Sequence, residues 1–492
     1  MTVRLRSVVL LALGLLAPGA RAQAPAAPPD LTAAPPQATA APPPTAPPAE
    51  LGRYAPTKMS RGARWGWSFL EGPIGYSILQ NRFAYHLGSS PEVYDVDWDN
   101  FVDHLDGPWW YDEDQFATNQ FGHPYEGSMY YTAARSMGLS FYESFLMSEI
   151  GSFLWETAGE TEPPSVNDQI TTPIAGSILG EVLYRLSSRV VNAMSPGFWR
   201  ELSVAAISPF TGLNRQIVGD QRPGGRSFTD QPWFGQMRLS LAAAGTSTTN
   251  GAEVHDPTGA VSFAVRAQNG NPGSDWEFRG PFDYFDAAAS LVIDKDAGSK
   301  KAFGSLAMRG LVFGDDYGQG RSRGLWGLMA AYDYITPGSF RASSSNVSIG
   351  TVTQFPFGPD LALQGTAYAG IGYGAGGSAA EPAGKRDYHF GLQGVSLVEA
   401  RLLWADRGFL RLGGRSYYIS SKVTPETDSF EFIHYGEVEA VARISGPHAI
   451  AVTGIAATRR AQYADVPDVR SRASELMVSY VLVNDVMFGV GR

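Results

Sequence analysis

The sequence predicts an α+β chain in which an N-terminal helical domain precedes an antiparallel transmembrane β-barrel of about 12 strands. Two observations favour the barrel. From Trp233 onward, apolar and polar residues alternate with a period of two, as Arg238 and Ser240 do with Leu239 and Leu241. The charged residues lie on one side of each expected strand only. That arrangement is typical of a barrel whose polar face lines a lumen and whose apolar face meets lipid.

Turn-forming residues separate the expected strands and support their number. Glycine, asparagine, aspartate and proline cluster between the alternating segments, and these residues favour tight turns. The clusters lie at residues 269–273, 294–298, 315–320, 337–338, 374–377, 406–408 and 445–447. They indicate about 12 strands, and single-chain bacterial barrels have an even number of strands.

A soluble antiparallel sandwich is the main alternative, because it shows the same alternation. The polar face of this chain carries both signs of charge, with Arg266, Arg309 and Arg401 accompanied by Glu399 and Glu439. Charges of both signs suit a crowded polar lumen, so the barrel is the favoured prediction.

Three segments precede the barrel of residues 233–492. Residues 1–22 combine Arg4 and Arg6 with an apolar run at 8–16 and a small-residue triplet at 20–22, as secretory signal peptides do. Residues 23–57 are rich in proline and alanine, which favours an extended tether. Residues 58–220 show helical periodicity and predict the helical domain, either a plug in the lumen or a periplasmic domain. We therefore expect export and a location in the outer membrane of a Gram-negative cell envelope.

Composition narrows the classes of partner. The formal net charge of -10 argues against nucleic acid, which requires a basic surface. The chain has no cysteine, so disulfides do not stabilise it. Outer-membrane lipid is the expected partner, and a small-molecule or lipid ligand is left unidentified.

Capping motifs locate two helices in the helical domain. Ser140 and Glu143 form an S-x-x-E capping box that starts a helix running to about residue 157. Thr172 followed by Pro173 predicts a second helix start, with the helix running to about residue 192. A stripe of small residues through Gly176 predicts close packing between helices.

Spaced residues between positions 112 and 181 resemble a known family. They are Asp112-Glu113-Asp114-Gln115-Phe116, Asn119, His123-Pro124, Gly127, Tyr131, Ala134-Arg135, Gly138, Ser144, Gly151-Ser152, Trp155-Glu156, Pro164-Ser165, Asp168, Thr172-Pro173, Gly176 and Gly180-Glu181. Over roughly residues 95–195 the chain looks like the bacterial family catalogued as the domain of unknown function number 3943. The resemblance implies an exported envelope protein and brings no established activity with it.

The candidate catalytic residues lie in the same region. His123 and Glu126 share one helical face, where an acid beside an imidazole can transfer protons. With Asp168 or Glu181 as a further acid or base, they would serve an enzyme that acts on lipid or on an envelope polymer.

The competing hypothesis for these residues is structural. Ion-pair networks that hold helices together resemble functional sites, and the strong zinc motifs such as H-E-x-x-H are absent. On this hypothesis a buried polar network fixes the helices to each other or to the lumen wall, and its members are His123, Glu126, Arg135, Glu156, Asp168, Glu181 and Arg185.

A serine hydrolase is a more specific form of the enzyme hypothesis. Ser128, Ser144 and Ser165 lie in the same region as His123 and Asp168. None of these serines stands in a G-x-S-x-G nucleophile elbow, so the sequence gives a hydrolase little support.

A calcium loop is the candidate metal site, and calcium is the one cofactor that the sequence suggests. Asp95, Asp97, Asp99, Asp103 and Asp106 occupy positions 1, 3, 5, 9 and 12 of the calcium-loop pattern. Position 6 is asparagine instead of glycine, and position 12 is aspartate instead of glutamate. The alternative is a solvated acidic loop, which is the usual meaning of a run of acids.

Two classes of function remain open. The favoured class is a non-enzymatic outer-membrane protein, structural or pore-like, in which the lumen charges form a selectivity or docking surface. The other class is the lipid- or polymer-acting enzyme that uses His123 and Glu126.

Overall fold

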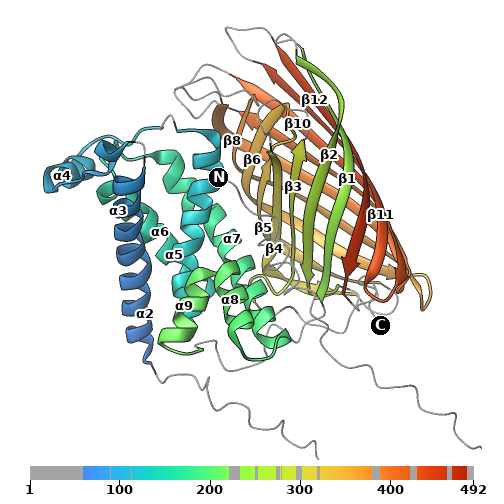
Figure 1. Ribbon diagram of the computed structural model, residues 1–492, viewed down its shortest axis with the longest axis horizontal. Coiled ribbons are helices and arrows are strands. Elements are labelled where there is room, and N and C mark those ends of the chain that lie inside the picture. The colour runs from blue at the N-terminus through green and yellow to red at the C-terminus, as the bar shows by residue number, and fades with distance from the viewer. Residues whose placement is uncertain are drawn as a thin grey trace, which may run out of the picture.

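The protein consists of a helical bundle beside a closed β-barrel, as the computed structural model in Figure 1 shows. The structure describes residues 59–88, 90–111, 114–220, 233–249, 253–272, 278, 280–294, 302–318, 322–378, 388–420, 429–462 and 468–484. The expected signal peptide and Pro/Ala-rich tether lie outside these residues. The predicted fold class, in which helices precede an antiparallel barrel, is confirmed.

The bundle begins with a continuous helical rod. α2 (Arg61–Phe69) passes through the π-helical segment η2 (Leu70–Tyr76) into α3 (Ser77–Leu87). Pro73 lies inside η2, and its missing N–H accounts for the local change of helix type.

The remaining helices, apart from α7, are shorter than this rod. They are η3 (Pro91–Tyr94), α4 (Trp98–Asp106), η4 (Thr118–Gly122), α5 (His123–Ser136), α6 (Phe141–Ala158), α7 (Val166–Ala193), α8 (Phe198–Ile207) and α9 (Pro209–Ile217). None of the helices in the described part of the chain combines the length and the apolar character that crossing a membrane requires.

One predicted helix start is confirmed and the other is wrong. α6 begins at the expected capping box, in which the Ser140 hydroxyl accepts from the Glu143 N–H and the Glu143 carboxylate accepts from the Ser140 N–H. α7 begins instead after Ser165, whose side chain caps it, so Thr172 and Pro173 lie inside the helix. Packing against α5 on both sides of the proline explains why the helix continues through it.

α5 and α7 pack backbone against backbone. A Cβ atom on Gly127 would lie 1.9 Å from the Thr172 carbonyl oxygen, and one on Gly176 would lie 2.6 Å from the Gly127 Cα. Only glycine permits helices to approach this closely. The small-residue stripe therefore marks a helix contact, as predicted.

In the described part of the chain, twelve antiparallel strands close into the barrel. They are β1 (Trp233–Thr249), β2 (Glu253–Asn269), β3 (Phe285–Asp294), β4 (Ala302–Tyr317), β5 (Arg323–Ile335), β6 (Phe340–Pro356), β7 (Leu361–Ser378), β8 (Tyr388–Trp404), β9 (Gly408–Ser420), β10 (Phe430–Ser445), β11 (His448–Gln462) and β12 (Val469–Val483). β1 pairs with both β2 and β12, so the sheet has no open edge.

The two faces of the barrel divide as the alternation predicts. On β1, Gln236 and Ser240 are buried inside the barrel, while Leu239 and Leu241 are exposed on the outer face. The predicted turn between β10 and β11 has Gly446 in the left-handed region (φ 51°), which glycine adopts without strain.

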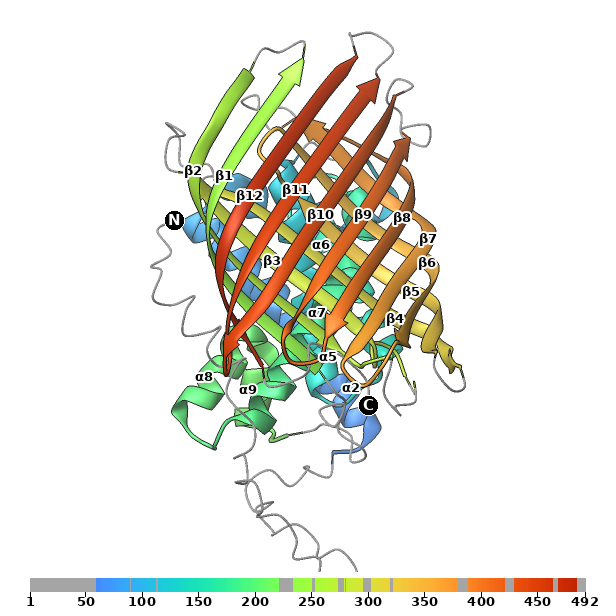
Figure 2. The same cartoon turned by 90° about the vertical axis from the view of Figure 1, so that its right-hand side faces the viewer.

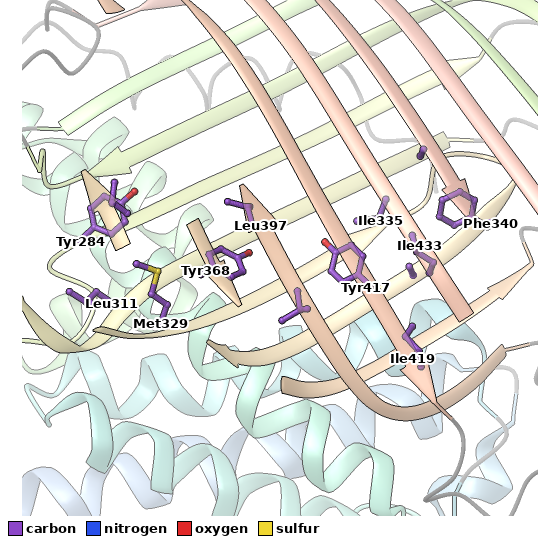
Figure 3. Close-up of a cluster of buried hydrophobic side chains, with 14 of the residues drawn as sticks. Tyr284, Leu311, Met329, Ile335, Phe340, Tyr368, Leu397, Tyr417, Ile419 and Ile433 are labelled. Carbon is purple, nitrogen blue, oxygen red and sulfur yellow. The ribbon is translucent and has the colours of Figure 1, made fainter. Parts of the chain in front are cut away.

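Apolar side chains fill part of the barrel interior (Figure 3). Met329, Tyr368, Leu397 and Tyr417 come from four different strands and belong to one buried cluster. This packing leaves the lumen occupied by the side chains of the strands themselves.

The bundle packs against the outer wall of the barrel, beside β3, β4 and β5 (Figures 1 and 2). Phe141 of α6 stacks on Phe282, just before β3, with ring centroids 5.6 Å apart. Ile178 and Leu179 of α7 share an apolar cluster with the outward-facing Leu306 of β4. The expectation of a plug in the lumen is therefore wrong for the described bundle, because α7 covers apolar wall and the lumen is filled from the strands.

A second contact joins the segment before α5 to β8. Phe116 packs on Tyr388 and Phe390, which face outward at the start of that strand. Asn119 donates from its side-chain amide to the Tyr388 hydroxyl at 2.9 Å. The bundle is thus attached to the wall by both apolar packing and hydrogen bonds.

Candidate functional site

Polar side chains at the contact between α5 and α7 form two clusters. The helices run parallel, because His123 of α5 meets Asp168 of α7 near both starts, and Arg135 meets Glu181 farther along both. The glycine contact between the two helices brings the chains close enough for these side chains to meet.

The first cluster centres on His123. Its Nδ1 lies 3.2 Å from Glu126 Oε2, and its Nε2 lies 3.7 Å from Asp168 Oδ2. Tyr130 donates to the other oxygen of Glu126 at 2.8 Å. All four side chains are buried, so the cluster is sealed inside the bundle.

This arrangement keeps His123 charged. Burial opposes the imidazolium, but Asp168, Glu126 and Glu156 outweigh that effect and raise the pKa of His123 well above its ordinary value. A general base must be neutral before it can accept a proton. The charged state therefore argues against His123 as a general base, and its buried partners agree with the structural hypothesis.

The second cluster centres on Glu181. Arg135 Nε lies 2.8 Å from Glu181 Oε2, and Arg185 Nε lies 2.7 Å from Oε1, the latter within one helix at a spacing of four residues. Tyr131 also donates to the carboxylate at 2.8 Å. Burial opposes ionisation of Glu181, but the two guanidinium groups outweigh it and lower the pKa of the carboxyl. Arg185 further donates to the Pro281 carbonyl oxygen at 2.7 Å, which ties α7 to the barrel.

The structure therefore places the residues predicted for catalysis in two separate clusters. Three of them meet, and the fourth lies in the other cluster with two arginines of the predicted polar network. The first cluster holds His123, Glu126 and Asp168, with Glu156 acting on it electrostatically, and the second holds Glu181, Arg135 and Arg185.

The three serines considered for a hydrolase have backbone partners. Ser128 and Ser144 donate to carbonyl oxygens of their own helical turns at 2.6 and 2.9 Å. Ser165 accepts from a backbone N–H as the cap of α7. These bonds give each hydroxyl a local structural role.

The segment predicted as a calcium loop folds largely as a helix, so the expected loop geometry is wrong. The Asp97 carboxylate accepts from the Asn100 N–H at 2.9 Å, and the Asn100 side chain accepts from the Asp97 N–H at 3.1 Å. This capping box starts α4 and uses an expected ligand as a helix cap. Within the described residues, no group of three or more His, Cys, Asp or Glu side chains is placed to hold a metal ion. The carboxylates predicted as calcium ligands therefore do not converge on one point. They are Asp95, Asp97, Asp99, Asp103 and Asp106.

A third cluster, which we call the lumen belt, lies inside the barrel. Its members are four arginines and four carboxylates from β1, β2, β3, β4, β8, β9 and β10. They are Arg238, Arg266, Asp286, Arg309, Glu399, Arg411, Glu437 and Glu439. The sequence predicted inward charges of both signs, but not which of them pair.

The lumen belt connects opposite walls. Arg266 Nη2 on β2 lies 3.4 Å from Glu399 Oε1 on β8, and these strands are diametrically opposite in the ring. Arg401 of β8 donates to Gln268 of β2 at 2.9 Å and joins the same two walls. A cavity of about 50 Å³ remains beside the belt, which is room enough for ordered water next to the charged groups.

Known proteins resemble this chain only in part. No curated protein matches the chain. Solved structures that resemble it include an outer membrane channel from Pseudomonas putida F1 (10% identity, 51% of this chain and 95% of that chain, TM-score 0.28). They also include the Pseudomonas putida toluene transporter TodX (8% identity, 54% and 90%, TM-score 0.20) and Pseudomonas aeruginosa OpdO (10% identity, 51% and 97%, TM-score 0.16). At TM-scores this low, these likenesses carry no conclusion about function. Residues 108–210, which include both polar clusters of the bundle, match the family model of the Domain of unknown function (DUF3943), as the sequence resemblance predicted.

Proposed function

We propose that the chain is an outer-membrane channel that its lumen belt holds closed. The observation that carries the proposal is the pair between Arg266 and Glu399, which joins opposite walls of the barrel. The membrane location is supported by the outer face, where residues such as Leu412 (61% exposed) and Val478 (61% exposed) point away from the barrel.

The chemistry of the lumen belt favours a channel over a purely structural barrel. Buried ion pairs are weak stabilisers, and apolar residues of similar volume often replace them without loss. A barrel that only needed to be solid would therefore be filled equally well by apolar side chains. Charges that line a lumen can also select ions once the pairs separate.

Conductance in planar lipid bilayers tests the proposal. The wild-type protein should be closed most of the time. Glu399 lies within 3.6 Å of Arg266, Arg309 and Arg411. Glu399→Gln removes this common partner, while Arg266 and Arg309 keep Asp286, and Arg411 keeps Glu437 and Glu439. Removing one partner of a buried pair costs roughly 3–5 kcal/mol, so the open fraction should rise by more than about tenfold.

Asp360→Asn is the matched control, because Asp360 is an exposed carboxylate in the turn between β6 and β7. It should leave the closed state unchanged. Full conductance in the wild-type protein would contradict the proposal, since the belt would then not close the lumen. If neither Glu399→Gln nor the double variant Glu399→Gln with Glu439→Gln conducts ions, the structural alternative is favoured.

A further inference from the structure

The bundle combines buried polar clusters with several large apolar side chains that are exposed. The His123 and Glu181 clusters are buried, whereas large apolar side chains of α3 and α8 point outward. Leu79 is 66% exposed, Leu87 is 71% exposed and Phe198 is 71% exposed. Apolar side chains of this size lose contact with water when lipid covers them. The outer surface of the bundle therefore suits contact with lipid.

An apolar groove of about 630 Å³ lies between the bundle and the outer wall of the barrel. Leu183 and Leu186 of α7 line one side, and Val265, Ala289 and Leu306 of β2, β3 and β4 line the other. Ligand sites commonly have volumes of roughly 300–1,000 Å³ and mostly apolar linings. The groove is therefore large enough to hold a ligand.

The groove is continuous with the lipid-facing surface of the barrel. Leu291 lines the groove and is also 41% exposed, so the groove opens sideways along the wall. Farther along the same outward rows, Val261 and Ile293 are exposed. A chain entering from the bilayer would meet apolar surface along the whole path.

We infer that this groove holds an acyl chain of a membrane phospholipid, with the bundle lying at the depth of the bilayer. The inference rests on the membrane location proposed above and not on the state of the lumen. The apolar lining matches a hydrocarbon chain, and the sideways opening onto the outer face makes the bilayer its source.

Photolabelling of the full-length protein tests this inference. The protein is reconstituted into phosphatidylcholine vesicles in which a fraction of the lipid carries a diazirine on one acyl chain, and labelled peptides are identified by mass spectrometry. We expect label on α7 around Leu183 and Leu186. Val438 and Ile450, which face outward on β10 and β11 away from the groove, report ordinary lipid contact.

Two groove variants and one control make the result specific. Ala289→Trp fills the groove with a bulky side chain, and Ala206→Asp places a charge on its lining. Both should reduce the labelling of α7 several-fold and leave the labelling of Val438 unchanged. Ala440→Trp adds the same bulk to an exposed outward position on β10 and should leave α7 labelling as in the wild-type protein.

The outcomes separate this inference from the proposed function. Unchanged labelling of α7 in both folded groove variants would overturn it, as would a wild-type α7 that carries no label while Val438 and Ile450 are labelled. Absence of label on the strands as well would refute the membrane location itself. Each variant must show the same gel mobility as the wild-type protein before and after heating. If Ala289→Trp fails to fold, the labelling of Ala206→Asp tests the inference.

Discussion

Replacing Gly176 by alanine should separate α5 from α7 and destabilise the bundle. The added Cβ would lie 2.6 Å from the Gly127 Cα and 2.9 Å from the Ser128 backbone nitrogen. Both are backbone atoms, so no side chain can rotate out of the way. Because carbon atoms in contact are about 3.5–4.0 Å apart, the helices must move apart by about 1 Å.

The expected loss of stability combines three effects. Overpacking a well-packed core costs about 1–3 kcal/mol, and replacing glycine by alanine in a helix returns about 1 kcal/mol. Separation also stretches the buried pair between Arg135 and Glu181, and breaking such a pair costs roughly 3–5 kcal/mol. With the pair weakened but not broken, the free energy of unfolding of the bundle should fall by about 2–4 kcal/mol.

Thermal melts of the full chain in detergent, followed by circular dichroism at 222 nm, measure this loss. Gly66→Ala is the matched control, because Gly66 lies in α2 and an added Cβ there meets nothing within 4 Å. The control should be neutral or gain up to about 1 kcal/mol. A Gly176→Ala protein that melts at or above the temperature of Gly66→Ala would refute the close contact between α5 and α7.

Three further substitutions test the clusters and the cap. Because the pKa of His123 is raised in the folded bundle, its contribution to stability is fully present below about pH 6.5 and is lost as the pH rises through the raised value. The melting temperature of the helices should therefore fall from pH 6 upward, and His123→Gln should abolish this fall. Arg185→Met should cost roughly 3–5 kcal/mol, because it leaves buried Glu181 with one cation fewer, whereas Arg61→Met, at an exposed pair, should cost less than about 1 kcal/mol in the same melts. Ser140→Ala removes the cap of α6 and should cost about 0.5–2 kcal/mol, and a melt equal to that of the wild-type protein would show that the cap contributes nothing.

Features encoded within a few residues could be predicted from the sequence. The period of two fixes which side of each strand faces the lumen, because successive side chains point to opposite faces. The capping box of α6 is likewise local, since Ser140 and Glu143 satisfy each other's backbone groups. The pair between Glu181 and Arg185 follows from their spacing on one helix.

Two predictions made from local sequence patterns were wrong, because a different local interaction determines the structure at each place. Asp97 fits both a calcium loop and a helix cap, and Asn100 decides the outcome by completing a capping box. Pro173 fits the first turn of a helix, but Ser165 caps α7 earlier and packing against α5 carries the helix through the proline. In both places the sequence pattern was compatible with two structures.

Contacts between distant segments could not be predicted. Arg266 meets Glu399 only because the sheet closes and places β2 opposite β8. Phe141 meets Phe282 only because the bundle docks on the outer wall. A sequence signal for that docking is the small size of Ala287 and Ala289, which face outward on β3 and leave room for α7.

Crosslinking of introduced cysteines tests most directly the claim that the bundle lies outside a barrel filled by its own side chains. The chain has no cysteine, so each pair can be examined without background. Phe141→Cys with Phe282→Cys should crosslink efficiently with a short bifunctional thiol reagent in intact outer membranes, and Ile178→Cys with Arg266→Cys should not. Efficient crosslinking of the second pair without the first would place the bundle in the lumen and contradict both the closed channel and the lipid groove.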